Sequence, residues 1–464
     1  MVGRQSKKGV LVADNRKKAF LAAVGVGTLD QALLAVLPSR HQSLRLLGLG
    51  RSVLIVDEVH AYDPYMHTLL RNLLQFHAAQ GGSAILLSAT LPRKTRQELV
   101  NSFRQGTGDV SFPLQVNDYP LFTHVNPAGG LEQPISARRG SSRTVRVKIV
   151  HESATVETLV KEAAAAGRCA CWVRNTVADA VSAYERLSRD LGEDNVMLFH
   201  ARFALGDRLE LERDVLRLFG KDSSHEDRAG KILIATQVVE QSLDLDFDFM
   251  VTDLAPIELI IQRAGRLHRH PRGARGLATL CILCPPLNAA PKSTWYSDVF
   301  PQASYVYPSH GQLWLAANML IERGKFIVPD DARCLVETVY GEEEGDVVPQ
   351  ELRKRDLDAD GKSRADISLA QLNGLNLDAG YTTTLNQWLE DTVTPTRVGA
   401  PTTTVRLARW DGTTLMPWFS TDRFAWDLSQ VSVNRARIAE PSHHDKVLEA
   451  EVERATESMP GDRG

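Results

Sequence analysis

Short runs of apolar residues alternate with helix-like segments along the first 290 residues of the chain. Residues 53–56, 84–87, 232–235 and 249–251 are continuous apolar runs that lead into polar residues. Continuous rather than alternating apolar strands are typical of a parallel sheet that is covered by helices on both faces. The pattern therefore predicts an α/β fold in two blocks, one ending near residue 110 and one spanning about 144–286.

The rest of the chain differs from these blocks in composition. The connector between them is rich in Pro, Gly, Asn and Arg, and the α/β rhythm stops after residue 286. Residues 380–420 alternate Thr, Val, Leu and Trp, which predicts a small β-rich C-terminal domain. The expected divisions are a first, partial block (1–120), a connector (121–143), a second block (144–290), a linker region (291–378) and a C-terminal domain (379–464).

Composition narrows the class of protein. Hydrophobic residues make up 43% and charged residues 24% of the 464, the balance of a folded soluble chain. No apolar stretch approaches the roughly 18 residues of a transmembrane helix, and the N-terminus has no signal-peptide core. No membrane association is therefore expected, and five cysteines, few and odd in number, predict a reducing cytoplasm. The net charge of −3 neither favours nor excludes nucleic acid.

Two groups of residues that could form sites are predicted to be core instead. Cys281 and Cys284 form a C-x-x-C inside the apolar run LATLCILCPP, and no second ligand pair accompanies them, so buried strand thiols are expected rather than a metal site. Trp295, Tyr296 and Trp314 are interpreted as core aromatics rather than base-stacking platforms.

The strongest chemical signal is VLIVDEVHAYD, where an apolar strand ends at Asp57 and Glu58, with His60 two residues later. Ligands bind at the carboxyl edge of open α/β sheets. Two carboxylates there suit a Mg²⁺-nucleotide site, one holding the metal through water and the other polarising the attacking water. The alternative is an acidic N-cap of the next helix.

A second strand ends at Ser88-Ala89-Thr90. Two hydroxyls at a strand end can couple the carboxylates to a neighbouring domain through hydrogen bonds. By themselves they are more often caps or turns.

A third strand, in ILIATQVVEQSLDLDFDFMVTD, ends at Thr236 and Gln237 and is followed by a polar turn that includes Asp244. Uncharged polar groups and backbone amides are natural phosphate and sugar contacts. The alternative is a helix cap.

Arginines then recur every three residues in IIQRAGRLHRHPRGAR, from Arg263 to Arg275. The simplest interpretation is a solvated basic helix face, although Gly265, Pro271 and Gly273 argue against one long helix. The sharper interpretation assigns Arg266 and Arg269 to the γ-phosphate of a nucleotide, where a planar guanidinium matches the spreading charge of the transition state.

In this order, the four elements resemble motifs II, III, V and VI of the two RecA-like domains of a superfamily 2 helicase. Together with VGTLDQALL at 26–34 and DEVHAYDPYMHTLL, they are similar to the type I CRISPR-associated helicase-nuclease, which the Cascade surveillance complex recruits. The similarity is good over about residues 10–290 and weaker over 380–430. It implies an α/β fold with two RecA-like parallel-sheet domains, the first incomplete, and a small β-rich C-terminal domain.

The resemblance also implies roles for individual residues in ATP-driven 3′-to-5′ movement on single-stranded DNA. Asp57 would hold Mg²⁺ and Glu58 would activate water, with Arg266 and Arg269 as the other catalytic groups. The remaining residues are expected to bind the nucleotide (Gln262, Arg263, Gly265, Asp244), to couple the domains (His60, Ser88, Thr90) or to contact the DNA backbone (Gly27, Thr28, Thr236, Gln237).

The sequence departs from the family at two points. No G-x-x-x-x-G-K-[ST] phosphate loop occurs in it, and no HD nuclease motif either; His444-Asp445, in a polar tail, is interpreted as an exposed accident. We therefore expect an incomplete helicase segment that does not hydrolyse ATP by itself. It could be a truncated product, a remnant, or a split subunit whose partner chain carries the loop and the nuclease. The alternatives are a non-catalytic DNA- or Cascade-binding module and another superfamily 2 helicase, such as one acting on RNA.

Overall fold

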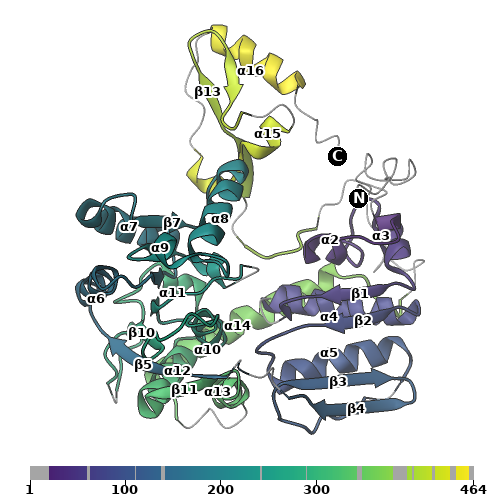
Figure 1. The fold of residues 1–464 in the computed structure, drawn as a ribbon. Coiled ribbons are helices and arrows are strands. Elements are labelled where there is room, and N and C mark those ends of the chain that lie inside the picture. Colours follow the sequence, from purple (N-terminus) through teal and green to yellow (C-terminus); the bar gives the residue numbers. More distant parts are fainter. Residues whose placement is uncertain are drawn as a thin grey trace, which may run out of the picture.

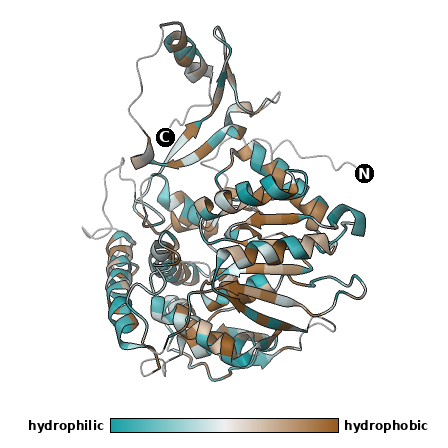
Figure 2. Cartoon of the chain, turned by 90° about the vertical axis from the view of Figure 1, so that its left-hand side faces the viewer, coloured by the Kyte–Doolittle hydropathy of each residue, from teal (hydrophilic) through white to brown (hydrophobic). Residues whose placement is uncertain are grey.

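The computed structural model describes residues 20–59, 63–109, 111–136, 140, 142–240, 243–288, 290–341, 347–379, 394–399, 402–420, 424–438 and 446–458. Among these, no helix combines the length and the apolar character that crossing a membrane requires. Two α/β blocks lie side by side, and a smaller C-terminal unit stands above the second (Figure 1). The strands at the centre of the blocks are mostly hydrophobic, whereas the surrounding helices carry many hydrophilic residues (Figure 2).

Within the part of the chain that the structure describes, the first block is built on two parallel strands, β1 (Val53–Val56) and β2 (Ser83–Leu86), paired from Val53↔Ser83 to Val56↔Leu86. Its apolar core lies chiefly against helix α4, whose Leu69, Leu70 and Leu73 are fully buried. The other elements are helices α2 (Leu29–Leu33), α3 (Gln42–Leu49), α4 (Pro64–Ala79) and α5 (Arg93–Gly106), and the antiparallel hairpin of β3 (Leu121–Asn126) and β4 (Gly129–Pro134).

Part of this two-stranded sheet is open to solvent. Val53, Ile55, Ile85 and Leu87 on or beside the strands are between 47% and 62% exposed. Exposed apolar side chains gathered on one sheet face favour association with another surface.

The second block holds a seven-stranded sheet in the order β11-β5-β10-β9-β6-β8-β7, parallel except for the edge strand β11. Every residue of β6, β8 and β9 is buried, which explains their continuous apolar runs. The strands are β5 (Arg143–Val150), β6 (Ala170–Val173), β7 (Val196–Phe199), β8 (Ile232–Ala235), β9 (Phe249–Asp253), β10 (Thr279–Leu283) and β11 (Lys325–Val328). Its helical segments are α6 (Ser153–Ala165), α7 (Val177–Leu191), α8 (Leu205–Phe219), α9 (His225–Arg228), η3 (Gln237–Val239) and α10 (Ile257–Ala264).

The residues assigned to the core by sequence are buried in this block. Cys281 and Cys284 lie on or beside β10, and burial raises their thiol pKa values to about 11 and about 12. Trp295, Tyr296 and Trp314 belong to the same apolar core. The predictions of buried thiols and core aromatics are confirmed.

The residues that follow β10 connect the two cores. They contain helices α11 (Ala303–Val306), α12 (His310–Arg323), α13 (Ala332–Tyr340) and α14 (Gln350–Asn373). Helix α14 is about 36 Å long at 1.5 Å per residue. Leu352 near its start packs in the second core, whereas Ala370 near its end packs in the first.

In its described residues the C-terminal unit has two antiparallel strand pairs and three helical segments, so it contains the strands that the sequence pattern predicts. The pairs are β12 (Thr402–Arg406) with β15 (Gln430–Asn434) and β13 (Ala408–Trp410) with β14 (Leu415–Pro417); the helices are α15 (Ala425–Leu428), η6 (Arg435–Arg437) and α16 (Lys446–Ser458). It rests on the start of α8, where Trp418 Nε1 donates to Asp207 at 2.8 Å. A side chain in place of Gly206 would collide with the Phe419 ring.

Candidate functional site

The acidic pair and the Ser-Ala-Thr turn lie next to each other at the carboxyl ends of β1 and β2. The amide of Leu87 donates to the Val56 carbonyl at 2.9 Å, and the amide of Val59 donates to the Leu87 carbonyl at 3.1 Å. The N-cap of α4 is Asp63, whose carboxylate accepts from the Met66 amide. The alternative that the acidic pair caps the next helix is therefore wrong.

Glu58 has an unusual backbone. Its φ is 54°, in the left-handed region, which costs a non-glycine residue roughly 1 kcal/mol or more. Its amide donates to Asp57 Oδ1 at 3.0 Å. Burial, followed by the charge of Asp57, raises the pKa of the Glu58 carboxyl, while Arg266 acts in the opposite direction. A strained backbone together with a raised carboxyl pKa is typical of a functional position.

The two hydroxyls of the next turn differ in their surroundings. Ser88 Oγ accepts from the Thr90 amide at 3.3 Å, so Ser88 does form the turn that was the alternative interpretation. Thr90 is buried, and its Oγ1 makes no hydrogen bond within the described part of the chain.

Thr236 and Gln237 lie at the carboxyl end of β8. Thr236 occupies the N-cap position of η3 but makes no side-chain cap bond. Gln237 Nε2 donates to the Asn175 carbonyl and to the Tyr307 hydroxyl, both at 3.0 Å. These contacts fix the Gln237 side chain at the sheet edge.

The arginine-rich segment is not a solvated helix face. Helix α10 ends at Ala264, before Gly265, as the glycine and proline positions predict. Arg263 is 0% exposed and pairs with Glu240 at 2.7 Å. It also donates to Thr252 Oγ1 and the Asp253 carbonyl. The interpretation as a basic surface is therefore wrong for this position, whose guanidinium organises the strand ends.

Arg266 is the most distinctive of these arginines because it is only 8% exposed and incompletely paired. Its Nη2 donates to the Glu240 carbonyl at 2.8 Å, and its Nε makes no hydrogen bond to the described residues. Burial, and then the charge of Arg269, lowers the Arg266 pKa to about 10. Arg269 is more exposed and pairs with Asp244 at 2.7 Å. A buried, partly unpartnered guanidinium favours an anion as its ligand.

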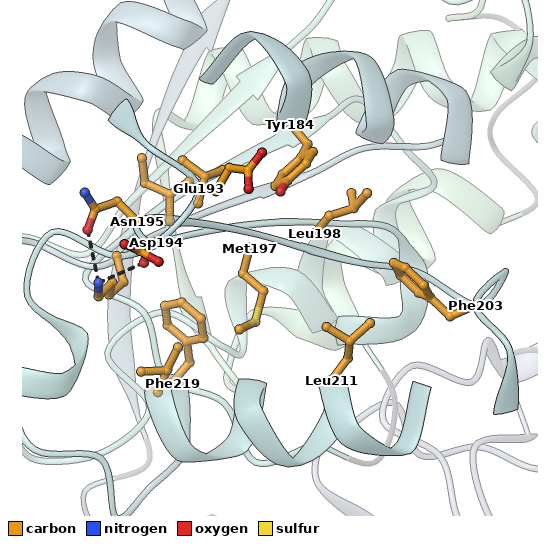
Figure 3. Close-up of a pocket in the computed structure, with 13 residues that line it drawn as sticks. Tyr184, Glu193, Asp194, Asn195, Met197, Leu198, Phe203, Leu211 and Phe219 are labelled. Atoms are coloured by element: carbon orange, nitrogen blue, oxygen red, sulfur yellow. Dashed lines mark hydrogen bonds between the residues drawn. The ribbon is translucent and has the colours of Figure 1, made fainter. Parts of the chain in front are cut away.

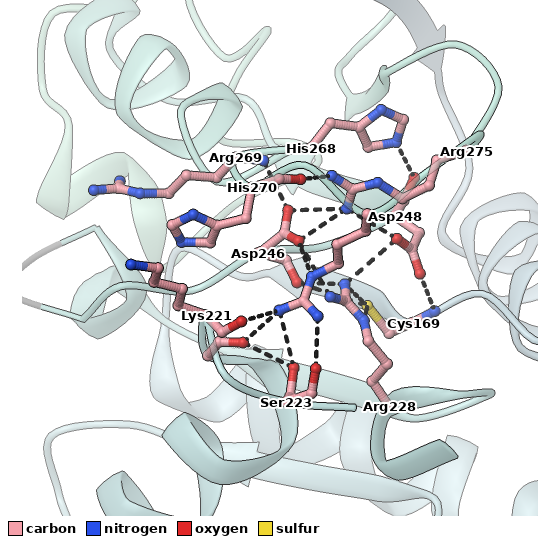
Figure 4. A network of polar contacts seen from close by, with 12 residues as sticks. Cys169, Lys221, Ser223, Arg228, Asp246, Asp248, His268, Arg269, His270 and Arg275 are labelled. Atoms are coloured by element: carbon pink, nitrogen blue, oxygen red, sulfur yellow. Dashed lines mark hydrogen bonds and ion pairs between the residues drawn. The ribbon is translucent and has the colours of Figure 1, made fainter. Parts of the chain in front are cut away.

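The segment that follows Arg266 is held by one fully buried carboxylate, Asp246 (Figure 4). Its Oδ2 accepts from Arg228, Arg272 and Arg275 at 3.1, 2.6 and 2.9 Å. Its Oδ1 accepts from the backbone amide of Arg269 at 2.7 Å. Asp246 lies in the segment between β8 and β9, and it thus holds the arginine segment against that part of the chain.

A cavity of about 190 Å³ brings together groups from both blocks. Glu58 and Ala89 contribute from the first block, and Gln262, Arg266 and Arg269 from the second. The other lining residues are Tyr119, Glu240, Ile261, Gly265, Val328, Pro329 and Ala332. Carboxylate on one wall and guanidinium on the other make this cavity the candidate site.

The other predicted residues lie around this cavity or away from it. Asp57 precedes Glu58 in the chain, Asp244 pairs with Arg269, and Arg263 is buried without reaching the cavity wall. Gly27 and Thr28 are on the exposed segment that enters α2. His60 and His444-Asp445 lie outside the described residues.

Sequence reasoning missed Tyr119 and Asp246, and it placed Glu240 in the polar turn after β8 without giving it a role. Glu240 is buried against Arg263 and also lines the cavity. Tyr119 and the β11–α13 turn lie outside the helicase-like motifs, so no local signal marks them. Asp246 sits in the repeated Asp pattern of LDLDFD, where only the fold distinguishes the buried carboxylate from its neighbours.

A larger hollow of about 330 Å³ lies between α7, β7 and α8 (Figure 3). Its walls are mainly apolar, with Tyr184, Met197 and Leu211 among them. At one end Lys231 Nζ is already satisfied by the Asp194 carbonyl and Asn195 Oδ1. It contains none of the predicted site residues, so the smaller cavity between the blocks is the better functional candidate.

Comparison with known proteins gives consistent results. Residues 166–272 match the family described as CRISPR-associated nuclease/helicase Cas3, C-terminal. The CRISPR-associated endonuclease/helicase Cas3 of Escherichia coli is 37% identical over 352 residues, which are 72% of this chain and 38% of that protein. The corresponding protein of Thermus thermophilus is 35% identical over 405 residues, 76% of this chain and 42% of that protein.

Solved structures agree with the sequence relatives. The crystal structure of T. fusca Cas3 with AMPPNP is similar with a TM-score of 0.78 and 29% identity, over 94% of this chain and 54% of that one. A chain of a CRISPR RNA-guided surveillance complex in a pre-nicking state is similar with a TM-score of 0.74 and 30% identity, over 94% and 56%. The chain thus spans about half the length, or less, of these relatives.

Proposed function

Because this chain belongs to the CRISPR-associated nuclease/helicase Cas3 family, as a homologue of the C-terminal-side portion of its members, we propose that it is an ATP-dependent helicase segment that acts on single-stranded DNA in type I CRISPR interference. The two blocks would act as RecA-like units. The observation that carries the proposal is the cavity in which Glu58 faces Arg266 and Arg269 across the boundary between the blocks.

Each side chain of this cavity has a role that follows from its environment. Glu58, with its raised pKa, accepts a proton from the attacking water. Arg266 and Arg269 donate to the γ-phosphate oxygens, where negative charge spreads in the transition state. Gln262, on the same wall, orients the nucleotide. Because these groups come from both blocks, hydrolysis and closure of the blocks are one event.

Asp57 and Glu58 also fit a magnesium ion. Mg²⁺ prefers one or two carboxylates together with water and phosphate oxygens, rather than a full cage of side chains. The described residues include no group of three or more His, Cys, Asp or Glu side chains that could hold a metal ion. Asp57 would hold the ion through water, and the ion supplies neutralisation of phosphate charge when bound.

DNA would cross the carboxyl-edge surfaces of both blocks. Gly27 and Thr28 on the first block, and Thr236 and Gln237 on the second, are the proposed backbone contacts. Gln237 is held at the sheet edge by its bonds to Asn175 and Tyr307, and Thr236 is buried beside it.

The open sheet face of the first block supports a further part of the proposal. The 464 residues contain no G-x-x-x-x-G-K-[ST] string, and Val53, Ile55, Ile85 and Leu87 are exposed. We propose that this face packs against the part of a Cas3-type helicase that carries the phosphate loop, within one polypeptide or from a separate one. The Cascade complex would recruit the completed enzyme.

The open face makes a prediction for the purified chain. Replacing Val53 and Ile55 together by Thr keeps the β-branched shape but removes exposed apolar surface. We expect less binding of a hydrophobic dye and less light scattering than for the unaltered chain. The control is Leu277→Thr, a single exposed apolar residue elsewhere, which should change neither signal. Equal dye binding by all three proteins would contradict an open face.

The proposed function is tested by ATP hydrolysis with and without single-stranded DNA. The measurement compares the 464-residue chain by itself with the same chain mixed with a family segment that carries the phosphate loop, called here the complemented chain. We expect no turnover by the chain itself and DNA-stimulated turnover by the complemented chain, because the loop amides and lysine hold the β- and γ-phosphates.

Other results would favour other functions. DNA binding that weakens with salt, without turnover in the complemented chain, would favour a non-catalytic binding module. Stimulation by RNA rather than DNA of matched sequence would favour another superfamily 2 helicase. Turnover by the chain itself would show that the loop is replaced by other groups.

A further inference from the structure

Helix α13 lies at the boundary of the two blocks, outside the helicase-like motifs (Figure 1). Its apolar face, with Leu335, Val336 and Val339, is buried in the core of the second block. Its other face carries Arg333 and Glu337, an i,i+4 ion pair at 3.0 Å that is mostly shielded from solvent. The helix is therefore fixed to one block and presents charge to the other.

That charged pair contacts the first block directly after the Ser-Ala-Thr turn. Arg333 Nη1 donates to the Leu91 carbonyl at 2.6 Å. Glu337 Oε1 accepts from the Arg93 amide at 2.8 Å, at the start of α5. The Arg333 guanidinium also lies 5.9 Å from the ring centre of Tyr119, which lines the candidate cavity. Two charge-assisted bonds to backbone thus hold the three residues that follow Thr90.

The same helix is tied to α10, the helix that leads to Arg266. The two helices pack together, and the Tyr340 hydroxyl donates to Glu258 on α10 at 2.5 Å. Ala332, the first residue of α13, lines the candidate cavity. Helix α13 therefore touches the groups that follow the Ser-Ala-Thr turn and the groups that precede the arginine segment.

We propose that Arg333 and Glu337 are positioning residues that hold the Ser-Ala-Thr turn of the first block at a fixed distance from α10 of the second. Neither residue lines the cavity, so they act through the turn and not on the nucleotide. Helix α14 joins the cores of the blocks separately. Loss of the α13 contacts would loosen the turn without separating the blocks. The expected effect on DNA binding rests on the proposed function, whereas the contact of Arg333 and Glu337 with the first block does not.

The contact is tested by amide hydrogen exchange on the full 464-residue chain. Glu337→Ala and Arg333→Ala should each speed exchange at Arg93 and the first turns of α5 by about tenfold, the effect of losing one such bond. Glu337→Gln keeps a carbonyl oxygen that can accept from the Arg93 amide, so its exchange should stay near that of the unaltered chain. Lys354→Ala, which removes an exposed ion pair on α14, is the control. Unchanged exchange in both alanine variants would overturn the proposal.

A second measurement separates positioning from simple structural support. The proposed DNA contacts lie on both blocks, so an oligonucleotide long enough to reach both gains affinity over one that reaches a single block, provided that the spacing is fixed. In the two alanine variants, the gain in affinity of the long over the short oligonucleotide should be several-fold smaller. Their affinity for the short oligonucleotide should be unchanged. A full gain together with faster exchange would overturn the positioning role. An unaltered chain that binds no DNA would contradict the proposed function, and the exchange result would still decide the contact.

Discussion

Replacing Glu58 by Gln is expected to lower DNA-stimulated ATP hydrolysis of the complemented chain by about 10²–10⁴-fold, the usual contribution of a general base. Glutamine keeps the size of the side chain and removes its charge and basicity. The backbone strain at φ 54° and the raised carboxyl pKa both support a functional role for this residue. Steady-state phosphate release over a range of ATP concentrations measures the effect, which should fall on kcat rather than on KM.

The matched control for this variant is Glu185→Gln on the exposed face of α7, which should leave turnover unchanged. DNA binding by the Glu58→Gln chain should also be unchanged, because Glu58 is not among the proposed DNA contacts. Turnover equal to that of the unaltered complemented chain would show that Glu58 is not the general base. The role of Arg266 and Arg269 in the cavity would then need another explanation.

Replacing Asp246 by Ala is expected to lower the free energy of unfolding by about 3–5 kcal/mol, the range for removing one partner of a buried ion pair. The variant leaves Arg272 without a carboxylate partner, leaves Arg228 and Arg275 with Asp248 alone, and frees the Arg269 amide. Urea unfolding monitored by tryptophan fluorescence gives the change. The control, Asp214→Ala, breaks an exposed pair with Arg217 and should cost below about 1 kcal/mol. Equal effects of the two variants would contradict the importance of the network.

The same network predicts a dependence on pH. Burial by itself raises the pKa of Asp246, but the arginines outweigh it, and the net pKa is lowered from its ordinary value of 3.8. A carboxyl whose pKa is lowered on folding stabilises the protein above its unfolded-state pKa and loses that contribution as the pH falls through its folded-state pKa. The difference between Asp246→Ala and the unaltered chain should therefore be full near neutral pH and shrink as the pH falls below 3.8.

Several details of the candidate site follow from local sequence. The strand ends at Asp57 and Thr236 were predictable because fully buried strands require continuous apolar runs. The end of α10 before Gly265 was predictable because glycine and proline disfavour a continuing helix. The cap of α4 was misjudged as an alternative role for the acidic pair, although Asp63-Pro64 is a typical N-cap followed by proline at the first helical position.

The sequence by itself determined the α/β class, the positions of the strands, the buried cysteines and the polar side chains at each strand end, because apolar periodicity and turn residues act over short distances along the chain. Only the tertiary structure decided which of these ends meet. It brought Glu58 and Arg266 to one cavity, buried Arg263 away from the cavity wall, and made Asp246 the carboxylate that holds the arginine segment. It also gave α13 and α14 contacts to both blocks. Such contacts join residues far apart in the chain, and their partners are selected by the packing of whole sheets and helices, which no local pattern records.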